Sequence, residues 1–100
     1  MKFDADNRSI ICEAIDFFGE DNQVDKAIEE MAELTKALLK NRHEKSSCNY
    51  NNVNEEIADV AIMLEQLIMI FDTAEIVKFV DIKLNRLNVR IANQSQGGTR

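Results

Sequence analysis

The sequence has few of the residues that interrupt helices. Proline and tryptophan are absent from its 100 residues, and of the three glycines one stands at position 19 and two near the C-terminus. Proline breaks the interior of a helix and glycine weakens it. Long stretches consist of Glu, Lys, Leu, Ala and Met, which favour helix. The composition therefore predicts an all-α protein.

Long hydrophobic runs are also missing. The longest purely apolar stretches are residues 60–64 and 67–71, five residues each, whereas a membrane-spanning helix needs about 20. The N-terminus meets acidic residues at once and lacks the basic-then-apolar pattern of a secretory signal. We expect a cytoplasmic protein with no membrane partner.

Cysteine and histidine are scarce. Cys12 and Cys48 lie far apart without a Cys-x-x-Cys unit, and His43 is the one histidine. This spacing indicates neither a zinc site nor a disulfide framework, so both cysteines are interpreted as free thiols. A di-iron bundle would need Glu-x-x-His units on two helices, which one histidine cannot supply.

The charge balance is acidic, with 18 Asp and Glu against 12 Lys and Arg and a formal net charge of −6. Such a chain is repelled by the phosphate backbone of nucleic acids and by anionic lipid. We therefore expect no nucleic-acid polymer as a partner. Carboxylates are, however, suitable ligands for metal ions.

Hydrophobic periodicity predicts four helices. Their expected limits are residues 9–18, 22–40, 54–71 and 73–92. Gly19 is placed to end the first helix in a left-handed conformation, Asn22 to cap the second, and Asp72 to start the fourth. The polar residues 41–52 are expected to form a mobile loop.

These helices are expected to form a compact four-helix bundle, because strict coiled-coil heptads are missing. The second half of the third helix is apolar on several faces, which is typical of a helix buried on all sides. Assembly as a dimer or a dimer of dimers is therefore expected. Residues 1–93 are predicted to form a single helical domain, and residues 94–100 a disordered tail.

One acidic pattern occurs twice. Residues 29–34 (EEMAEL) match residues 55–60 (EEIADV) with conservative changes only. Residues three apart project from adjacent turns of one helix face. Each copy carries such a carboxylate pair: Glu30 with Glu33, and Glu56 with Asp59.

The four carboxylates converge if the two helices pack antiparallel, and the small Ala32 and Ala58 would allow a close approach. A single acidic pair is usually a solvated helix face, but its repetition on two neighbouring helices favours a site. An all-oxygen ligand set selects hard cations such as Mg²⁺ or Mn²⁺.

At these residues the sequence resembles the MazG-like, all-α nucleoside triphosphate pyrophosphohydrolases, which are related to the dimeric dUTPases and the phosphoribosyl-ATP pyrophosphohydrolases. Their signature is Glu-x-x-Glu, a spacer, then Glu-x-x-Asp; both motifs are present here with 22 residues between them. The Phe18-Gly19 turn followed by Gln23, and residues 83–87 (KLNRL), look like the short, phage-type members. The resemblance covers roughly residues 10–91.

The resemblance implies Mg²⁺-dependent hydrolysis of a (deoxy)nucleoside triphosphate between its α and β phosphates, which yields the monophosphate and pyrophosphate. A divalent ion, Mg²⁺ or in its place Mn²⁺, would be held by Glu30, Glu33, Glu56 and Asp59. Such an ion neutralises the triphosphate and lowers the pKa of a bound water. Glu33 is predicted to be catalytic, because it could orient or deprotonate that water.

Positive charge for the phosphates is expected from the fourth helix. Lys83, Arg86 and Arg90 form a basic strip beside its apolar stripe. Such a strip is as typical of a solvated helix flank or of a row of salt bridges as it is of phosphate binding. Since Lys83 and Arg86 belong to the segment 83–87 that resembles the family, these two are predicted to bind the substrate.

Two other functions fit the same sequence. One is a non-catalytic helical dimer, an interaction or adaptor module whose acidic faces contact a basic partner. The other is a protein that binds nucleotide and metal without turnover. Substitution of Glu56 or Asp59 by its amide distinguishes the enzyme from the adaptor. The enzyme would lose its Mg²⁺ dependence, whereas the adaptor would bind its partner more weakly.

Overall fold

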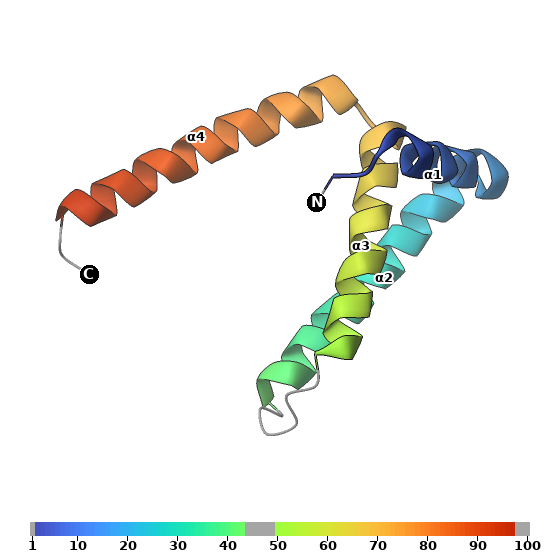
Figure 1. The fold of residues 1–100 in the computed structure, drawn as a ribbon, viewed down its shortest axis with the longest axis horizontal. Coiled ribbons are helices and arrows are strands. Elements are labelled where there is room, and N and C mark those ends of the chain that lie inside the picture. The colour runs from blue at the N-terminus through green and yellow to red at the C-terminus, as the bar shows by residue number, and fades with distance from the viewer. Residues whose placement is uncertain (1, 44–49, 98–100) are drawn as a thin grey trace.

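The computed structural model describes residues 2–43 and 50–97, and every regular element in these ranges is a helix. This confirms the all-α prediction and the number of helices. Figure 1 shows α2 and α3 side by side, α1 across one end of this pair, and α4 leading away from it. The bounds are α1 Ala5–Phe18, α2 Glu20–His43, α3 Asn51–Ile70 and α4 Thr73–Gly97.

The turn between α1 and α2 depends on one glycine. Gly19 has φ 93° and ψ 146°, so its φ is positive as predicted while its ψ is extended, and its N–H donates to the Ile15 carbonyl at 2.8 Å. The predicted cap at Asn22 is wrong, because α2 already begins at Glu20. The Asn22 side chain instead donates to the Phe18 carbonyl at 2.9 Å, and so completes the end of α1.

Replacement of Gly19 by alanine is expected to lower the free energy of unfolding by about 1–3 kcal/mol, the usual cost of forcing a side chain into such a backbone conformation. The cost is conformational, because a Cβ there would meet only Asn22 Nδ2 at 3.9 Å. Urea denaturation measures it, with Glu20→Ala as the control in ordinary helical backbone. Equal stability of the two variants would contradict the prediction.

The core lies between α1, α2 and α3. Residues three and four apart form the face of α2 turned to α3, and two of them, Ala27 and Ala37, are 0% and 5% exposed. The small side chains let the two antiparallel helices approach closely. Arg8 on α1 pairs with Glu65 on α3, Nε to Oε2 3.2 Å. The buried apolar residues are Ile11, Ile15, Ala27, Ala37, Val53, Val60 and Met63.

The buried face of α2 is not the one that its large apolar residues predict. Ile28 and Leu38 belong to the predicted stripe yet are 58% and 43% exposed. Ala32, expected at the helix contact, is exposed as well, and so is Ala58 on α3. The α2–α3 contact therefore uses the alanine-containing face and leaves a larger apolar stripe of α2 uncovered.

Helix α4 is capped by the residue before it. Asp72 Oδ1 accepts the Glu75 N–H at 3.1 Å, as the predicted start requires, and the Thr73 hydroxyl donates to the Ile68 carbonyl at 2.9 Å. Among residues 73–95 no side chain is buried, and Ile76 alone is half-buried. The helix extends to Gly97, five residues beyond its predicted end at Ala92.

The polar segment predicted as a loop is partly helical. Helix α2 continues to His43 and α3 begins at Asn51, which shortens the predicted loop 41–52 at both ends. Cys12 is an exposed free thiol, and Cys48 lies outside the described residues. Within the described ranges, none of the helices has the length and apolar character that a membrane crossing requires.

Candidate metal centre

Glu30 and Glu56 come from the faces by which α2 and α3 touch. On α2, Glu30 shares its face with the buried Ala27 and Ala37; on α3, Glu56 shares its face with the buried Val60. Both glutamates are accordingly half-buried. The repeated acidic motif therefore places one carboxylate from each helix at the seam between the two helices.

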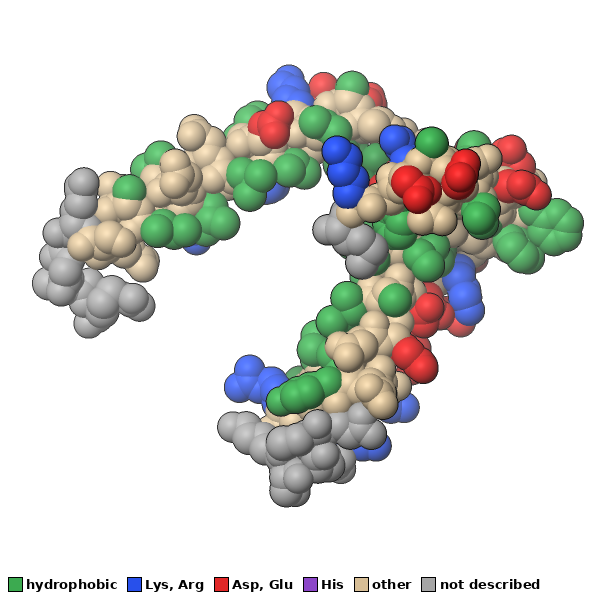
Figure 2. Space-filling model, viewed as in Figure 1, with side chains coloured by type: hydrophobic (Ala, Val, Ile, Leu, Met, Phe, Trp, Pro, Cys, Tyr) green, Lys and Arg blue, Asp and Glu red, His purple; other side chains and the backbone are tan. Residues whose placement is uncertain are grey.

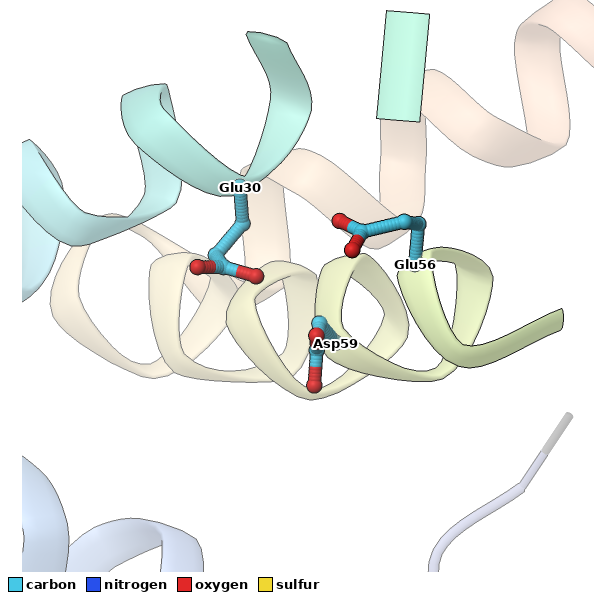
Figure 3. A group of neighbouring side chains, drawn as sticks. All are labelled: Glu30, Glu56 and Asp59. Carbon is cyan, nitrogen blue, oxygen red and sulfur yellow. The ribbon is translucent and has the colours of Figure 1, made fainter. Parts of the chain in front are cut away.

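Asp59 completes a three-carboxylate cluster. It lies three residues after Glu56, on the next turn of α3. One carboxylate oxygen from each of Glu30, Glu56 and Asp59 lies within 4.8 Å of the other two. Figure 3 shows Glu30 reaching from α2 toward α3, with the carboxylate of Glu56 pointing back toward it. We call these three residues the acidic cluster.

The electrostatics of the acidic cluster centre on Glu56. Burial raises the pKa of its carboxyl above the ordinary glutamate value, and the negative charges of Glu30, Asp59, Glu33 and Glu55, in that order, raise it further. Its Oε2 atom is buried, and no hydrogen-bond partner for it is found among the described residues. The surroundings of Glu56 thus disfavour the ionised form of its carboxyl group.

Glu33, the fourth predicted ligand, lies outside the acidic cluster. Its side chain is exposed on α2, one turn beyond Glu30. It is still near enough for its charge to raise the pKa of Glu56. The structure thus brings three of the four predicted carboxylates together and leaves the fourth at the edge.

Lys26 borders the acidic cluster, although the sequence analysis did not single it out. Its Nζ lies 3.4 Å from Glu30 Oε1. An open hollow of about 250 Å³ lies beside this pair and is lined by Lys26, Glu30, Asp59, Ile62 and Met63. The spacing of four residues between Lys26 and Glu30 was the available signal, because such residues meet on a helix surface.

The two predicted substrate-binding residues lie elsewhere in the chain. Lys83 and Arg86 are on α4, where with Arg90 they line a separate surface hollow beside apolar side chains of the same helix. Figure 1 shows α4 running away from the α2–α3 pair. Within one chain, therefore, the structure does not bring Lys83 or Arg86 to the acidic cluster.

A buried amide pair lies next to the hollow that Lys26 and Glu30 line. Gln23 Nε2 on α2 donates to Gln66 Oε1 on α3 at 2.7 Å, and Gln66 Nε2 lies 4.0 Å from the sulfur of Met63, which lines the hollow. Both glutamines are nearly fully buried. In the sequence, Gln66 lies between two apolar runs, a position that indicates a buried polar side chain. The sequence analysis interpreted it only as the end of an apolar stretch.

The acidic cluster fits a hard divalent cation. Its donors are carboxylate oxygens alone, the set that Mg²⁺ and Mn²⁺ prefer. Residues 2–43 and 50–97 supply no hydrogen-bond partner for the buried Oε2 of Glu56, an oxygen that a cation could satisfy. His43 stands at the last turn of α2, about 20 Å along the helix from Glu30 by the rise per residue. Imidazole ligation at the acidic cluster is thereby excluded for this residue.

Comparison of the chain with protein-family models, with curated proteins and with solved structures finds no match.

Proposed function

We propose that this protein is a Mg²⁺-dependent nucleoside triphosphate pyrophosphohydrolase that converts a (deoxy)nucleoside triphosphate to the monophosphate and pyrophosphate. The observation that carries the proposal is the convergence of Glu30, Glu56 and Asp59 within 4.8 Å, from two copies of one acidic motif on adjacent helices. The choice of the bond between the α and β phosphates rests on the resemblance of these motifs to the MazG-like enzymes.

The residues of the acidic cluster would hold the cation. A divalent ion bound there would neutralise phosphate charge and lower the pKa of a bound water. Glu33 is exposed at the edge of the acidic cluster, where it can accept a hydrogen bond from a water molecule and take its proton. An exposed position beside the three converging carboxylates suits a base better than a further ligand.

Lys26 is proposed to contact the phosphates. Its side chain is half exposed, and its ammonium group lies beside the hollow that Glu30 and Asp59 also line. A triphosphate that enters this hollow meets that positive charge without any movement of α4. With a cation held at the acidic cluster, the charge of Glu30 would be offset by that cation, which would leave the Lys26 ammonium group free to pair with a phosphate oxygen.

Replacement of Lys26 by methionine is expected to lower kcat/KM for the triphosphate about 10-fold or more, because a hydrogen bond to a charged group contributes about 1.5–3 kcal/mol. Methionine keeps most of the side-chain stem and removes only the charge. Initial rates at saturating Mg²⁺ measure the effect, and Lys36→Met, an exposed position on α2, is the matched control. Equal kcat/KM in the two variants would assign Lys26 a structural role only.

The proposed activity is tested with a panel of nucleoside and deoxynucleoside triphosphates, each incubated with Mg²⁺ or with chelator. Pyrophosphate and the nucleoside monophosphate are measured together, because their equal release identifies cleavage between the α and β phosphates. Metal-dependent release of both supports the enzyme and identifies its substrate. A folded protein that turns over none of these nucleotides would favour the non-catalytic interaction module.

A further inference from the structure

We infer that α4 docks on a second copy of this chain, against the apolar side of that copy's α2–α3 pair. Two uncovered apolar surfaces carry the inference. The first, named the α4 stripe, consists of Val80, Leu84, Leu87 and Ile91, which are 43–58% exposed. The second, named the α2–α3 apolar side, consists of Met31, Leu38, Ile57 and Leu64, which are 38–47% exposed.

Helix geometry puts the second surface opposite the acidic cluster. At about 100° per residue, Met31 and Leu38 lie roughly a quarter turn from the α2–α3 contact, and Ile57 and Leu64 do so on α3. Asp59 and Lys26 are rotated from the contact by a similar angle in the other direction. Figure 2 shows hydrophobic side chains along the side of α3 that faces α4, and acidic ones along the other side.

The α4 stripe and the α2–α3 apolar side lie across open space from each other within one chain. Figure 2 shows hydrophobic side chains also along the side of α4 turned toward α3, with a wide hollow between. In the part of the chain that the structure describes, α4 contacts no helix other than α3, and the capping bonds of Asp72 and Thr73 hold the corner where α4 departs. The chain thus presents two apolar surfaces to whatever enters this hollow.

The exposed area indicates how much surface a partner must cover. The chain exposes 8086 Å², whereas a folded monomer of 11.4 kDa exposes about 5,800 Å². Its radius of gyration is 17.3 Å, against about 13 Å for a compact domain of this length. If a pair of chains buried the whole excess, about 2,300 Å² from each, the interface would be about 4,600 Å², which is within the range of obligate dimers.

Charge favours a second copy as the occupant. Helix α4 carries four Lys and Arg against two acidic residues, whereas α2 and α3 together carry ten acidic residues against four Lys and Arg. The basic helix of one copy is therefore attracted to the acidic pair of another. A twofold axis satisfies both copies at once, since each α4 covers the other copy's α2–α3 apolar side. This inference does not depend on the proposed enzymatic function.

Light scattering during gel filtration at about 20 µM protein tests the inference. The wild type is expected at about twice 11.4 kDa or a multiple of that mass. Leu87→Asp is expected to weaken association at least about 100-fold and to give the mass of one chain, because an unpaired carboxylate at the centre of an apolar interface is costly. Val89→Asp is the matched control, since Val89 is 51% exposed but lies on the opposite side of α4. It should keep the wild-type mass.

Cross-linking identifies the surface that α4 covers. With both native cysteines replaced by serine, an equimolar mixture of Leu87→Cys and Leu64→Cys chains is treated with a flexible bismaleimide. Products that contain one chain of each kind support docking between copies. A chain that carries both substitutions is treated in the same way. A wild-type mass of one chain, or unchanged association of Leu87→Asp, would overturn the inference. Cross-links that form only within the chain carrying both cysteines would also overturn it, because they would show that α4 folds back on its own α3.

Discussion

Glu56→Gln is expected to lose metal-dependent release of pyrophosphate by about 100-fold or more. Glu56 is, like Glu30, a half-buried member of the acidic cluster, and its Oε2 has no hydrogen-bond partner among the described residues. The amide keeps the size of the side chain but cannot supply an anionic ligand. Changes even to groups that only support a metal ligand typically cost 10–100-fold in affinity or activity, so loss of a ligand itself should cost at least as much.

The neighbouring residue provides the control for this substitution. Glu55→Gln makes the same chemical change one residue earlier on α3, at an exposed side chain, and should retain most of the activity. Rates are measured as pyrophosphate release over a Mg²⁺ titration, so that weaker metal binding is distinguished from a lower maximal rate. If Glu56→Gln were as active as Glu55→Gln at every metal concentration, the acidic cluster would not be the catalytic centre.

The acidic cluster could be predicted because its signal is local. A six-residue pattern repeated on two helices defines one face of each, and helical spacing alone places Glu56 and Asp59 on neighbouring turns. The prediction then needed only that the two helices pack antiparallel with these faces together. Three of the four carboxylates meet in this way, and Glu33 remains at the edge because it is rotated farther from the α2–α3 contact.

The side of α2 that is buried could not be predicted from hydrophobicity. Its larger apolar residues, Ile28 and Leu38, stay exposed, while the face with Ala27 and Ala37 is buried. Periodicity identifies an apolar stripe but not which other surface covers it. If α4 of a second copy covers the α2–α3 apolar side, part of the predicted stripe is buried in the assembly. Association of two chains would then explain why this stripe is exposed in a single chain.

The position of α4 was unpredictable for a related reason. Its cap at Asp72 was readable from sequence, but the direction in which a helix departs depends on tertiary contacts, and few of these hold α4 to the rest of its own chain. Lys83 and Arg86, predicted from the resemblance to bind the substrate, therefore do not reach the acidic cluster within one chain. Lys26 was missed because a lysine four residues before a glutamate is common on solvated helix faces.

Divalent cations are expected to stabilise the wild-type protein at neutral pH. A ligand that binds only the folded state raises the free energy of unfolding by about 2.7 kcal/mol at 100 times its dissociation constant. Mn²⁺ or Mg²⁺ bound at the acidic cluster would act in this way and would relieve the repulsion among its carboxylates. Urea denaturation at pH 7.5, with a metal titration or with chelator, measures the increase, which should be largely lost in Glu56→Gln and retained in Glu55→Gln.

The dependence on pH has a definite sign. Because the pKa of Glu56 is raised in the folded state, this carboxyl is protonated more often in the folded protein than in the unfolded chain at pH values just above the ordinary glutamate pKa of about 4.3. The contribution of Glu56 to stability therefore falls as pH rises through this range toward its folded pKa. In chelator, Glu56→Gln should be more stable than the wild type at pH 7.5, and this advantage should shrink toward pH 4. A constant difference in the free energy of unfolding between the two proteins across this range would mean that the pKa of Glu56 is not raised by its surroundings. The electrostatic argument for a cation at the acidic cluster would then fail.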